Sequence, residues 1–325
     1  MPKAGVPTKE DQFTQRLTDI YSDKSKEIIA CHSILHSKTF RINTLKSNML
    51  EVLDSLKTKG FEITESSMQK AYICLNESES IRLSDTDASK SFKIYIQELS
   101  SMIPALLLDL QTGDKVLDLC AAPGSKTTQI ADTLGNKGEI VANEQNRDRF
   151  FKLMQIIKDY GAVVKTINEN GKILPHKYPN YVQYFDKIIV DVPCSNEASL
   201  RFDQPKTFKF WKSSNSSGLS KLQKGILAAG ISMLKPGGTL IYSTCTYAVE
   251  ENEGVVDWAL KKHPDIKLEE IDFSKIPELE NVKNTLPGLT EYKNKNFDKS
   301  LGNTLRILPN EYFKGFYVAK LIKRL

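Results

Sequence analysis

Two cysteines in this sequence stand where covalent chemistry on a ligand is expected. Cys194 follows the apolar, strand-like segment 188–193, and Cys245 follows the similar segment 239–244. A third segment of the same kind, 116–119, precedes a loop of small residues. In an open α/β sheet, ligands bind outside the carboxyl ends of the strands. We therefore expect both thiols to face one crevice, beside whatever that loop binds.

Thiols in such a crevice suit methyl transfer to a pyrimidine. Carbon 5 of cytosine is too electron-poor to attack a methyl sulfonium, but thiolate addition at carbon 6 makes carbon 5 nucleophilic. After methyl transfer, the carbon 5 proton leaves and the thiol is expelled. A nearby cation such as Lys126 would favour the thiolate. Asp191 would hydrogen-bond the exocyclic amine and the ring nitrogen of the base. Cys31 and Cys74 are expected to be small structural residues.

The loop 120–126 joins a strand to a helix, and we expect it to hold a nucleoside cofactor. Its small residues let a ligand approach the backbone, and a helix N-terminus favours a negative group. Glu144 stands about 20 residues after the loop, where a carboxylate for ribose hydroxyls is expected. A phosphate-binding motif would need glycine in place of Ser125 and Cys120. S-adenosylmethionine fits better, because its loop does not have to wrap a pyrophosphate.

Strand and helix patterns alternate from about residue 97, which predicts a mostly parallel sheet with helices on both faces. Candidate strands lie at 116–119, 139–143, 163–167, 187–190 and 239–243, with two closing strands at 306–309 and 315–321. Candidate helices lie at 99–110, 126–134, 147–160, 219–234 and 251–262. The prediction is therefore a Rossmann-like sheet of seven strands. The segment 264–304 lacks a strong pattern and suggests an inserted loop.

The first part of the chain predicts a separate, smaller unit. Residues 1–36 are expected to be helical and polar. Between 38 and 75, the order strand-helix-strand-strand suggests a small α/β module of ferredoxin-like type. The polar segment 76–91 suggests a linker. We thus expect an N-terminal domain over 1–90 and a catalytic domain over 91–325.

Composition limits the class of protein. The chain has 325 residues, of which 40% are hydrophobic, enough for a substantial core. No apolar run is long enough to span a membrane, and no secretory signal is recognisable at the start. Five scattered cysteines and four histidines give no metal-ligand spacing, so we expect no metal and a reducing cytoplasm. The net charge of +5 is compatible with a nucleic-acid partner but does not require one.

The motifs together resemble the Fmu/Sun-type RNA 5-methylcytosine methyltransferases, which use S-adenosylmethionine. The resemblance spans roughly 38–325. It is carried by Arg41-Ile42-Asn43-Thr44-Leu45-Lys46, Tyr95-Ile96-Gln97-Glu98-Leu99-Ser100-Ser101-Met102, Leu117-Asp118-Leu119-Cys120-Ala121-Ala122-Pro123-Gly124, Asp191-Val192-Pro193-Cys194-Ser195 and Tyr242-Ser243-Thr244-Cys245-Thr246 with Glu250-Glu251-Asn252-Glu253. The combination of Pro-Cys with Thr-Cys is highly specific. It implies a class I methyltransferase fold acting on ribosomal or transfer RNA, as a monomer.

The resemblance also implies roles for single residues. Cys245 is implied to be the nucleophile, and Cys194 the cysteine that helps to release the methylated product. Asp191 and Lys126 are implied to lie at the target base, beside the methyl donor. The implied cofactor-binding residues are Cys120, Ala121, Ala122, Pro123, Gly124, Ser125, Lys126, Glu144, Asn170 and Asp191.

Three departures from the family pattern affect the fine geometry of the site. Asn170 stands where the family has an aspartate near the adenine, so we expect weaker or altered cofactor affinity. Ser125 replaces the second glycine of Pro-Gly-Gly-Lys. Asn196 and Ala198 replace the glycines of Cys-Ser-Gly-Glu-Gly, which removes residues that adopt positive φ readily.

RNA contacts are expected at two places. Lys206, Lys209, Trp211 and Lys212 interleave cations with aromatics, which suits phosphate neutralisation and base stacking. The alternative is that the aromatics pack the loop onto the sheet and the lysines are merely solvated. Arg41 and Asn43 of the small module are implied by the resemblance. Two other functions stay open: a non-catalytic RNA-binding assembly factor and a small-molecule methyltransferase, neither of which needs two thiols.

Overall fold

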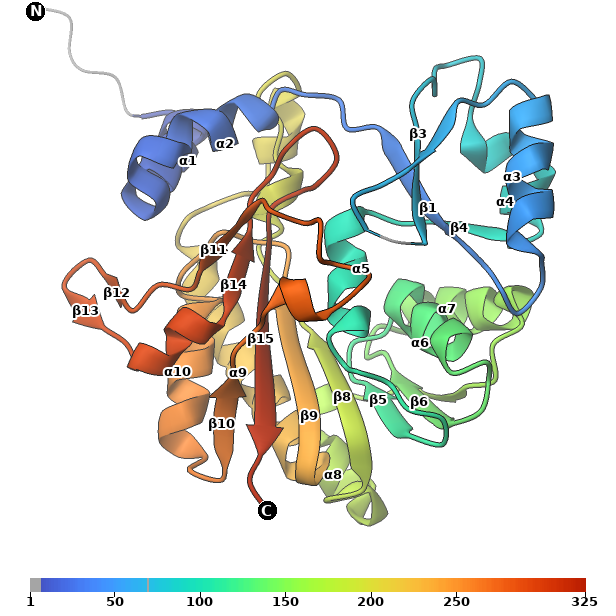
Figure 1. Cartoon of the computed structure of the whole chain (residues 1–325). Coiled ribbons are helices and arrows are strands. Elements are labelled where there is room, and N and C mark those ends of the chain that lie inside the picture. Colours follow the sequence, from blue (N-terminus) through green and yellow to red (C-terminus); the bar gives the residue numbers. More distant parts are fainter. Residues whose placement is uncertain (1–6, 69) are drawn as a thin grey trace, which may run out of the picture.

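The central sheet is mixed and lies between helices (Figure 1). The computed structural model describes residues 7–68 and 70–325, and within them the sheet has nine strands in the order β11-β14-β15-β9-β8-β5-β6-β7, with β10 also paired to β15. Their bounds are β5 Lys115–Asp118, β6 Glu139–Asn143, β7 Lys165–Ile167, β8 Phe185–Asp191, β9 Leu234–Thr244, β10 Ile266–Glu269, β11 Thr285–Pro287, β14 Leu305–Ile307 and β15 Phe316–Lys323.

Parallel pairing is confined to one half of this sheet. Strands β7, β6, β5, β8 and β9 run parallel, whereas β15 pairs antiparallel with β9, β14 and β10. The α/β prediction is confirmed, but the predicted count of seven mostly parallel strands is wrong. The two additional strands, β10 and β11, form inside 264–304, where short strands give too weak a pattern to read.

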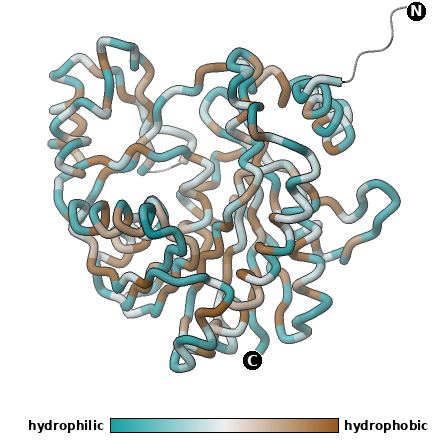
Figure 2. Tube along the Cα trace, turned by 180° about the vertical axis from the view of Figure 1, so that it is seen from behind, coloured by the Kyte–Doolittle hydropathy of each residue, from teal (hydrophilic) through white to brown (hydrophobic). Residues whose placement is uncertain are grey.

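Helices cover both faces because successive strand residues point to opposite sides. Ile188 and Val190 of β8 belong to one hydrophobic core, and Ile189 between them belongs to the other. In chain order, the helices that precede or alternate with these strands are α5 Leu99–Leu106, α6 Ser125–Thr133, α7 Arg147–Tyr160, α8 Leu174–Lys177, α9 Asn215–Met233 and α10 Glu253–Lys262. Seen from behind, the strands carry much of the hydrophobic colour and lie inside hydrophilic outer turns (Figure 2).

The N-terminal helices pack on the large sheet rather than on the small module. Helices α1 (Lys9–Tyr21) and α2 (Ser25–Cys31) carry apolar residues that share a core with Trp211 and Tyr247. Phe13 and Leu17 are fully buried there, so α1 is amphipathic and not simply polar as expected. The part of the expected helical segment at 1–6 lies outside the described residues.

The small module is a four-stranded antiparallel sheet with two helices on it. Its strand order is β2-β3-β1-β4. The elements are β1 Lys38–Ile42, α3 Met49–Thr58, β2 Ile63–Glu65, β3 Ala71–Cys74, α4 Asp87–Lys90 and β4 Ile94–Ile96. The sequence patterns gave no sign of α4, which lies inside the expected linker, or of β4. The last strand therefore enters the sheet beyond residue 91, immediately before α5.

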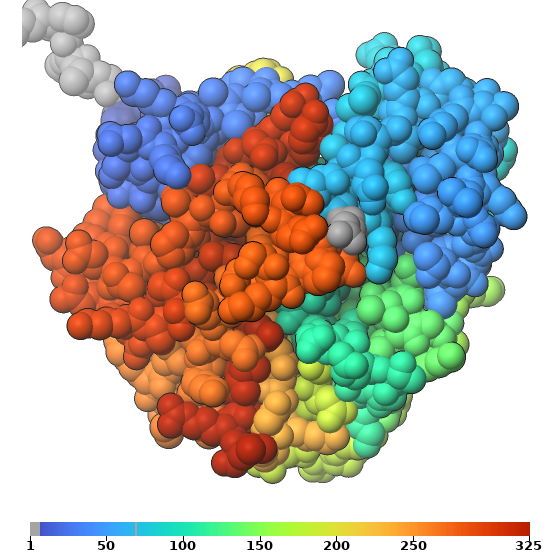
Figure 3. Space-filling model, in the orientation of Figure 1, coloured from blue at the N-terminus to red at the C-terminus, as the bar shows by residue number. Residues whose placement is uncertain are grey.

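The segment 264–304 is a covering layer rather than a loose insertion. Besides β10 and β11 it forms a hairpin of β12 (Glu291–Tyr292) and β13 (Lys295–Asn296). Leu279 and Val282 are buried in the same core as α5 and α6. In the space-filling view this segment, in orange, covers the centre of the face beside the small module (Figure 3). No helix in the described part of the chain is long and apolar enough to cross a membrane.

Candidate active site

The two cysteines at the ends of β8 and β9 lie side by side. These strands pair in parallel with Asp191 opposite Ser243, so the chain segments that follow leave the sheet together. The Sγ atoms of Cys194 and Cys245 are 3.2 Å apart. Both residues line one cavity of about 450 Å³, together with the loop after β5. The structure thus brings the two thiols and the small-residue loop into one site.

The environment makes the two thiols unequal. The pKa of Cys194 is well above its usual range because of its hydrogen bond with Cys245 and because the side chain is buried. Cys194 therefore keeps its proton and lies where it can donate to a charged sulfur on Cys245. The S–H of Cys245 donates to Asn196 Oδ1 at 3.1 Å. Asn196 has φ 54° and ψ 37°, the left-handed conformation that asparagine tolerates better than most residues.

A cation and a carboxylate line the same cavity and are fixed by hydrogen bonds. The Nζ atom of Lys126 donates to Asp191 Oδ2 at 2.7 Å and to Ser101 Oγ at 2.8 Å. The hydroxyl of Ser243 donates to Asp191 Oδ1 at 2.7 Å. Both carboxylate oxygens are thereby oriented, and each retains a lone pair for a ligand. The side chain of Asp191 is 27% exposed, whereas that of Lys126 is 7% exposed, so the carboxylate is the group a base can reach.

The loop after β5 fits the methionine end of S-adenosylmethionine. Ala121, Ala122 and Pro123 leave the backbone open to the cavity, and the Ala122–Pro123 peptide bond is cis. Gly124 has φ 117°, and a Cβ there would lie 3.1 Å from Leu153, so only glycine fits without strain. The Ser125 substitution has a mild effect, because Ser125 is the first residue of α6, a helical position that needs no glycine.

Asp118 is a site residue that the sequence patterns missed. One oxygen accepts from Thr127 Oγ1 at 2.6 Å, and the other, Oδ1, is buried without a hydrogen-bond partner among the described residues. Burial raises the pKa of Asp118 to about 6. A buried, half-satisfied carboxylate on the cavity wall suits a cationic ligand group, such as the ammonium of the methyl donor. The residues therefore fit this cofactor. The sequence signal that could have identified Asp118 is its position as the last residue of β5, directly before the small-residue loop.

Glu144 and Asn170 lie further along the sheet edge, after β6 and β7. Glu144 Oε1 accepts from the backbone N–H of Asn146 at 2.7 Å, and Oε2 is 3.4 Å from Nη1 of Arg149. Arg149 lines the cavity of the thiols, whereas Glu144 and Asn170 are outside its lining. Asn170 Oδ1 caps its own turn by accepting from the N–H of Lys172 at 3.1 Å. This geometry leaves its amide NH₂ turned away from that bond and available to a ligand.

Two buried glutamates form hydrogen bonds with the chain segments that carry the two thiols. Glu251 accepts from the backbone N–H of Ser195 at 3.0 Å and from Gln223 at 2.8 Å. Glu197 accepts from Thr246 Oγ1 at 2.9 Å. It also accepts from the indole N–H of Trp211 at 3.1 Å, and it forms an ion pair with Arg16 at 3.1 Å. Both glutamates stand in motifs that carry the family resemblance, but nothing in sequence alone indicated that they are structural.

The residues expected at RNA separate into buried and exposed groups. Arg41 donates to the Ser125 carbonyl at 3.0 Å and to Thr128 Oγ1 at 2.6 Å, and also contacts Tyr160. Asn43 donates to the Tyr160 carbonyl at 2.8 Å. Both are buried and join the small module to α6 and α7. Neither side chain is therefore placed to contact RNA as expected. Trp211 is also buried. The exposed members are Lys206, Lys209 and Lys212.

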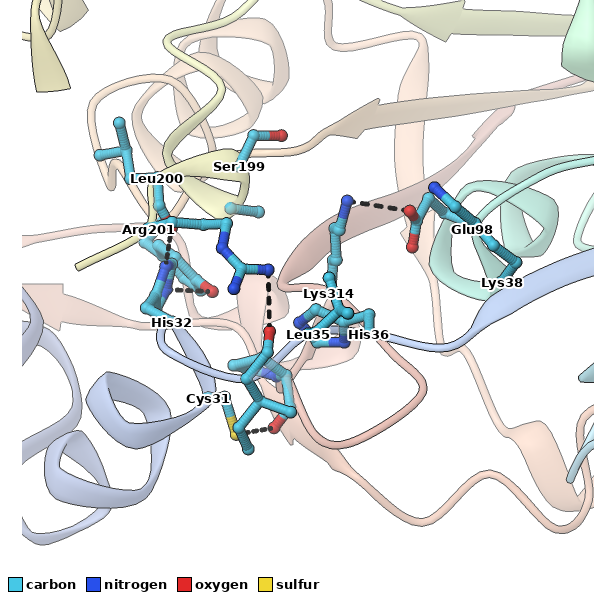
Figure 4. A pocket seen from close by; sticks show the side chains of 14 residues that line it. Cys31, His32, Leu35, His36, Lys38, Glu98, Ser199, Leu200, Arg201 and Lys314 are labelled. Atoms are coloured by element: carbon cyan, nitrogen blue, oxygen red, sulfur yellow. Dashed lines mark hydrogen bonds and ion pairs between the residues drawn. The ribbon is translucent and has the colours of Figure 1, made fainter. Parts of the chain in front are cut away.

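A smaller cavity of about 120 Å³ lies where the N-terminal segment meets the loop after Cys194 (Figure 4). Three of its polar side chains bond across chain segments. His32 Nδ1 donates to the Leu200 carbonyl at 2.6 Å, Arg201 donates to the Ile34 carbonyl at 3.1 Å, and Lys314 pairs with Glu98 at 2.8 Å. These contacts tie three parts of the chain together, which identifies the cavity as a structural junction.

Comparison with known proteins identifies the family of this chain. The family described as "16S rRNA methyltransferase RsmB/F" matches residues 105–322. The tRNA (cytosine(49)-C(5))-methyltransferase of Pyrococcus abyssi is 34% identical over 96% of this chain and 97% of its own length. The ribosomal RNA small subunit methyltransferase F of Escherichia coli is 34% identical over 91% of this chain but only 59% of its own length.

Among solved structures, a methyltransferase homologue from Pyrococcus horikoshii superposes with a TM-score of 0.77 at 28% identity. The alignment covers 97% of this chain and 95% of that protein. The match extends over the small module and the N-terminal helices as well as the large sheet, because it takes in nearly the whole of both chains. The chain belongs to the RsmB/F family of methyltransferases.

Proposed function

We propose that this chain methylates carbon 5 of a cytosine in ribosomal or transfer RNA, with Cys245 as the covalent nucleophile. The observation that carries the proposal is the 3.2 Å contact between two sulfurs in the cavity that the cofactor loop also lines. S-adenosylmethionine supplies an electrophilic methyl group on a sulfonium. Carbon 5 of cytosine attacks a methyl donor only after a nucleophile has added to carbon 6. A thiol in this cavity can be that nucleophile.

The residues have separate roles toward the base. The Cys245 thiolate adds to carbon 6, and electron density moves to the ring nitrogen and carbonyl. Asp191 accepts a hydrogen bond from the exocyclic amine and orients the ring, while Lys126 and Ser243 hold that carboxylate. Carbon 5 then carries both the new methyl group and its original proton.

Product release needs the carbon 5 proton and the Cys245 sulfur to leave. The proton passes to solvent, and the electron pair of its C–H bond restores the ring as the C6–S bond breaks. Cys194, which keeps its proton and lies in contact with Cys245, stabilises the departing thiolate by donating to it. The acid form of Cys194 is therefore the useful form at this step.

The adenosine end of the cofactor is proposed to lie beyond Arg149, toward Glu144 and Asn170. Glu144 is buried at the end of β6, a position suited to ribose hydroxyls. The amide NH₂ of Asn170, which the bond from Lys172 leaves free, would then donate to a ring nitrogen of the adenine, where the family's aspartate can only accept. We further propose a ferredoxin-like module over 38–98, followed by the catalytic domain. Helices α1 and α2 join the latter, because they share its core.

The test is methyl transfer from labelled S-adenosylmethionine to total tRNA and to rRNA, with 5-methylcytidine measured by mass spectrometry. The wild-type chain is expected to methylate one of them, and Cys245→Ala to give no product. Cys194→Ala is expected to accumulate a protein–RNA adduct that resists denaturant, because the departing thiolate lacks its donor. Cys194→Ser, which keeps a donor, is the matched control and should accumulate less. Full activity of Cys245→Ala would refute the nucleophile.

A further inference from the structure

A second cavity adjoins the catalytic one on the side away from the cofactor loop. It has a volume of about 470 Å³ and shares Cys194 and Asn196 with the catalytic cavity. Its outer wall comes from the segment between β8 and α9, including Phe210 and Lys212. A ligand that reaches the reacting sulfur therefore passes directly beside this space.

Phe210 is the unusual member of that wall. Its side chain is 80% exposed, whereas its neighbours Phe208 and Trp211 are 1% and 5% exposed. Trp211 is fixed by Glu197, and Phe208 packs against Phe13 of α1. The anchored residues on either side fix where the chain presents this ring to solvent, and the ring itself gains no burial. A phenyl ring exposed in this way can stack on a flat ligand.

The charge around the ring suits a polyanion. The cavity lining includes Lys212 and, among the described residues, no aspartate or glutamate. The Nζ atom of Lys209 lies 5.2 Å from the Phe210 ring centre, and Lys206 is exposed nearby in sequence. Asp203, an acid of the same segment, is neutralised by Arg201 at 2.6 Å. An aromatic platform flanked by lysines is the usual arrangement for single-stranded nucleic acid.

We propose that this second cavity binds the base of the unpaired nucleotide next to the target cytosine, stacked on Phe210, with its phosphate near Lys209 and Lys212. The proposal rests on the proposed function, since it places two successive bases of one RNA strand in two adjoining cavities. Stacking on a phenyl ring is tolerant of base identity, so the subsite fixes the position of the strand rather than its sequence.

The test uses an RNA oligonucleotide that the wild-type chain methylates, and two derivatives with an abasic site immediately 5′ or 3′ of the target. For the wild type, one abasic derivative is expected to lower kcat/KM about tenfold, the size of one lost base–aromatic stack. The kcat/KM of Phe210→Ala on the intact oligonucleotide should also be about tenfold below that of the wild type. On the abasic derivative, the kcat/KM of this variant should fall little further. Phe210→Trp should retain wild-type behaviour. Phe151→Ala removes a phenylalanine that is 51% exposed on α7 and lines neither cavity, so it is the matched control.

Two outcomes would overturn the subsite. One is a Phe210→Ala variant that behaves like Phe151→Ala on the intact oligonucleotide. The other is an equal abasic penalty in Phe210→Ala and in the wild type, which would show that the missing base was bound elsewhere.

A binding measurement separates this proposal from the proposed function. The Cys245→Ala variant is titrated with a nine-nucleotide RNA that carries 2-aminopurine beside its single cytosine. Stacking quenches the fluorescence of this base, so quenching that disappears on Phe210→Ala supports the subsite even if no RNA is methylated. Equal fluorescence with and without Phe210 refutes the subsite while leaving methyl transfer intact.

Discussion

The inner wall of the catalytic cavity and the outer wall of the second cavity differ in how their side chains are used. The inner wall, formed by the residues after β8 and β9, is held by buried glutamates whose bonds reach Ser195, Thr246 and α1. The outer wall, residues 201–215, leaves Lys206, Lys209, Lys212 and Phe210 in solvent. Fixed groups suit bond-making, which tolerates little misplacement, whereas exposed groups suit a long flexible substrate. Substitutions should therefore affect stability on one wall and RNA binding on the other.

The largest effect is expected at Glu197. Glu197→Ala removes the buried carboxylate that pairs with Arg16 and accepts from the Trp211 N–H and from Thr246, which should lower the free energy of unfolding by about 3–5 kcal/mol. Urea denaturation measures it. Glu250→Ala removes the other carboxylate that pairs with Arg16, but that side chain is 44% exposed, so the change should stay near 1 kcal/mol or below. Equal losses in the two variants would mean that the inner wall is not held through Glu197.

Substitution of Arg41 should affect stability rather than RNA binding, as on the inner wall, although Arg41 carries a cationic side chain. Arg41→Ala removes donors from the Ser125 carbonyl, Thr128 and Gln97, all at the contact between the module and the large domain. We expect about 2–4 kcal/mol of destabilisation. The salt dependence of RNA binding should be unchanged in protein that is still folded. A reduced salt slope with normal stability would instead assign Arg41 to RNA.

The lysines of the outer wall should show the opposite pattern. Lys209→Ala and Lys212→Ala are expected to weaken RNA binding severalfold each and to lower the salt slope of log Kd by about one phosphate contact. Unfolding free energy should change by less than about 0.5 kcal/mol, because both side chains are exposed. Filter binding between 50 and 200 mM salt measures the slope. Lys262→Ala, at the end of α10 and outside both cavities, provides the comparison.

The smallest effect concerns pH and the methyl donor. An ammonium group binds the ionised form of Asp118, whose pKa is raised to about 6 by burial. Donor affinity should therefore fall as the pH drops through 6, by about fourfold between pH 7.5 and 5.5. Calorimetric titration with S-adenosylhomocysteine, which has the same ammonium, measures it. Asp118→Asn should bind more weakly at pH 7.5 and show little of this dependence.

The sequence predicted the inner wall better than the outer one. Cys194 and Cys245 each end a strand of a parallel pair, and parallel strands bring their ends together whatever the side chains between them do. Asp118 and Glu197 escaped prediction because their roles depend on burial and on partners distant in sequence. Trp211 and Phe210 are adjacent aromatics of one loop, and no periodicity tells which of them faces the core.

The same limit applies to the fold. Alternating strands and helices predicted the five parallel strands, since each βαβ unit has a strong local pattern. Strands β4 and β11 have three residues each, too short for an alternation to be seen. They exist because the edges of β1 and β14 offer free backbone partners. Tertiary pairing, rather than local sequence, decides such strands.

Two sulfurs 3.2 Å apart are also one two-electron oxidation away from a covalent bond. Hydrogen peroxide converts a thiolate to a sulfenic acid, and the adjacent thiol then displaces water to give a disulfide of about 2.05 Å. Joined in this way, neither sulfur could attack a base, although the cofactor loop would remain intact. The proximity that serves the release of the product thus makes methyl transfer sensitive to peroxide. A dithiol reductant should restore activity fully.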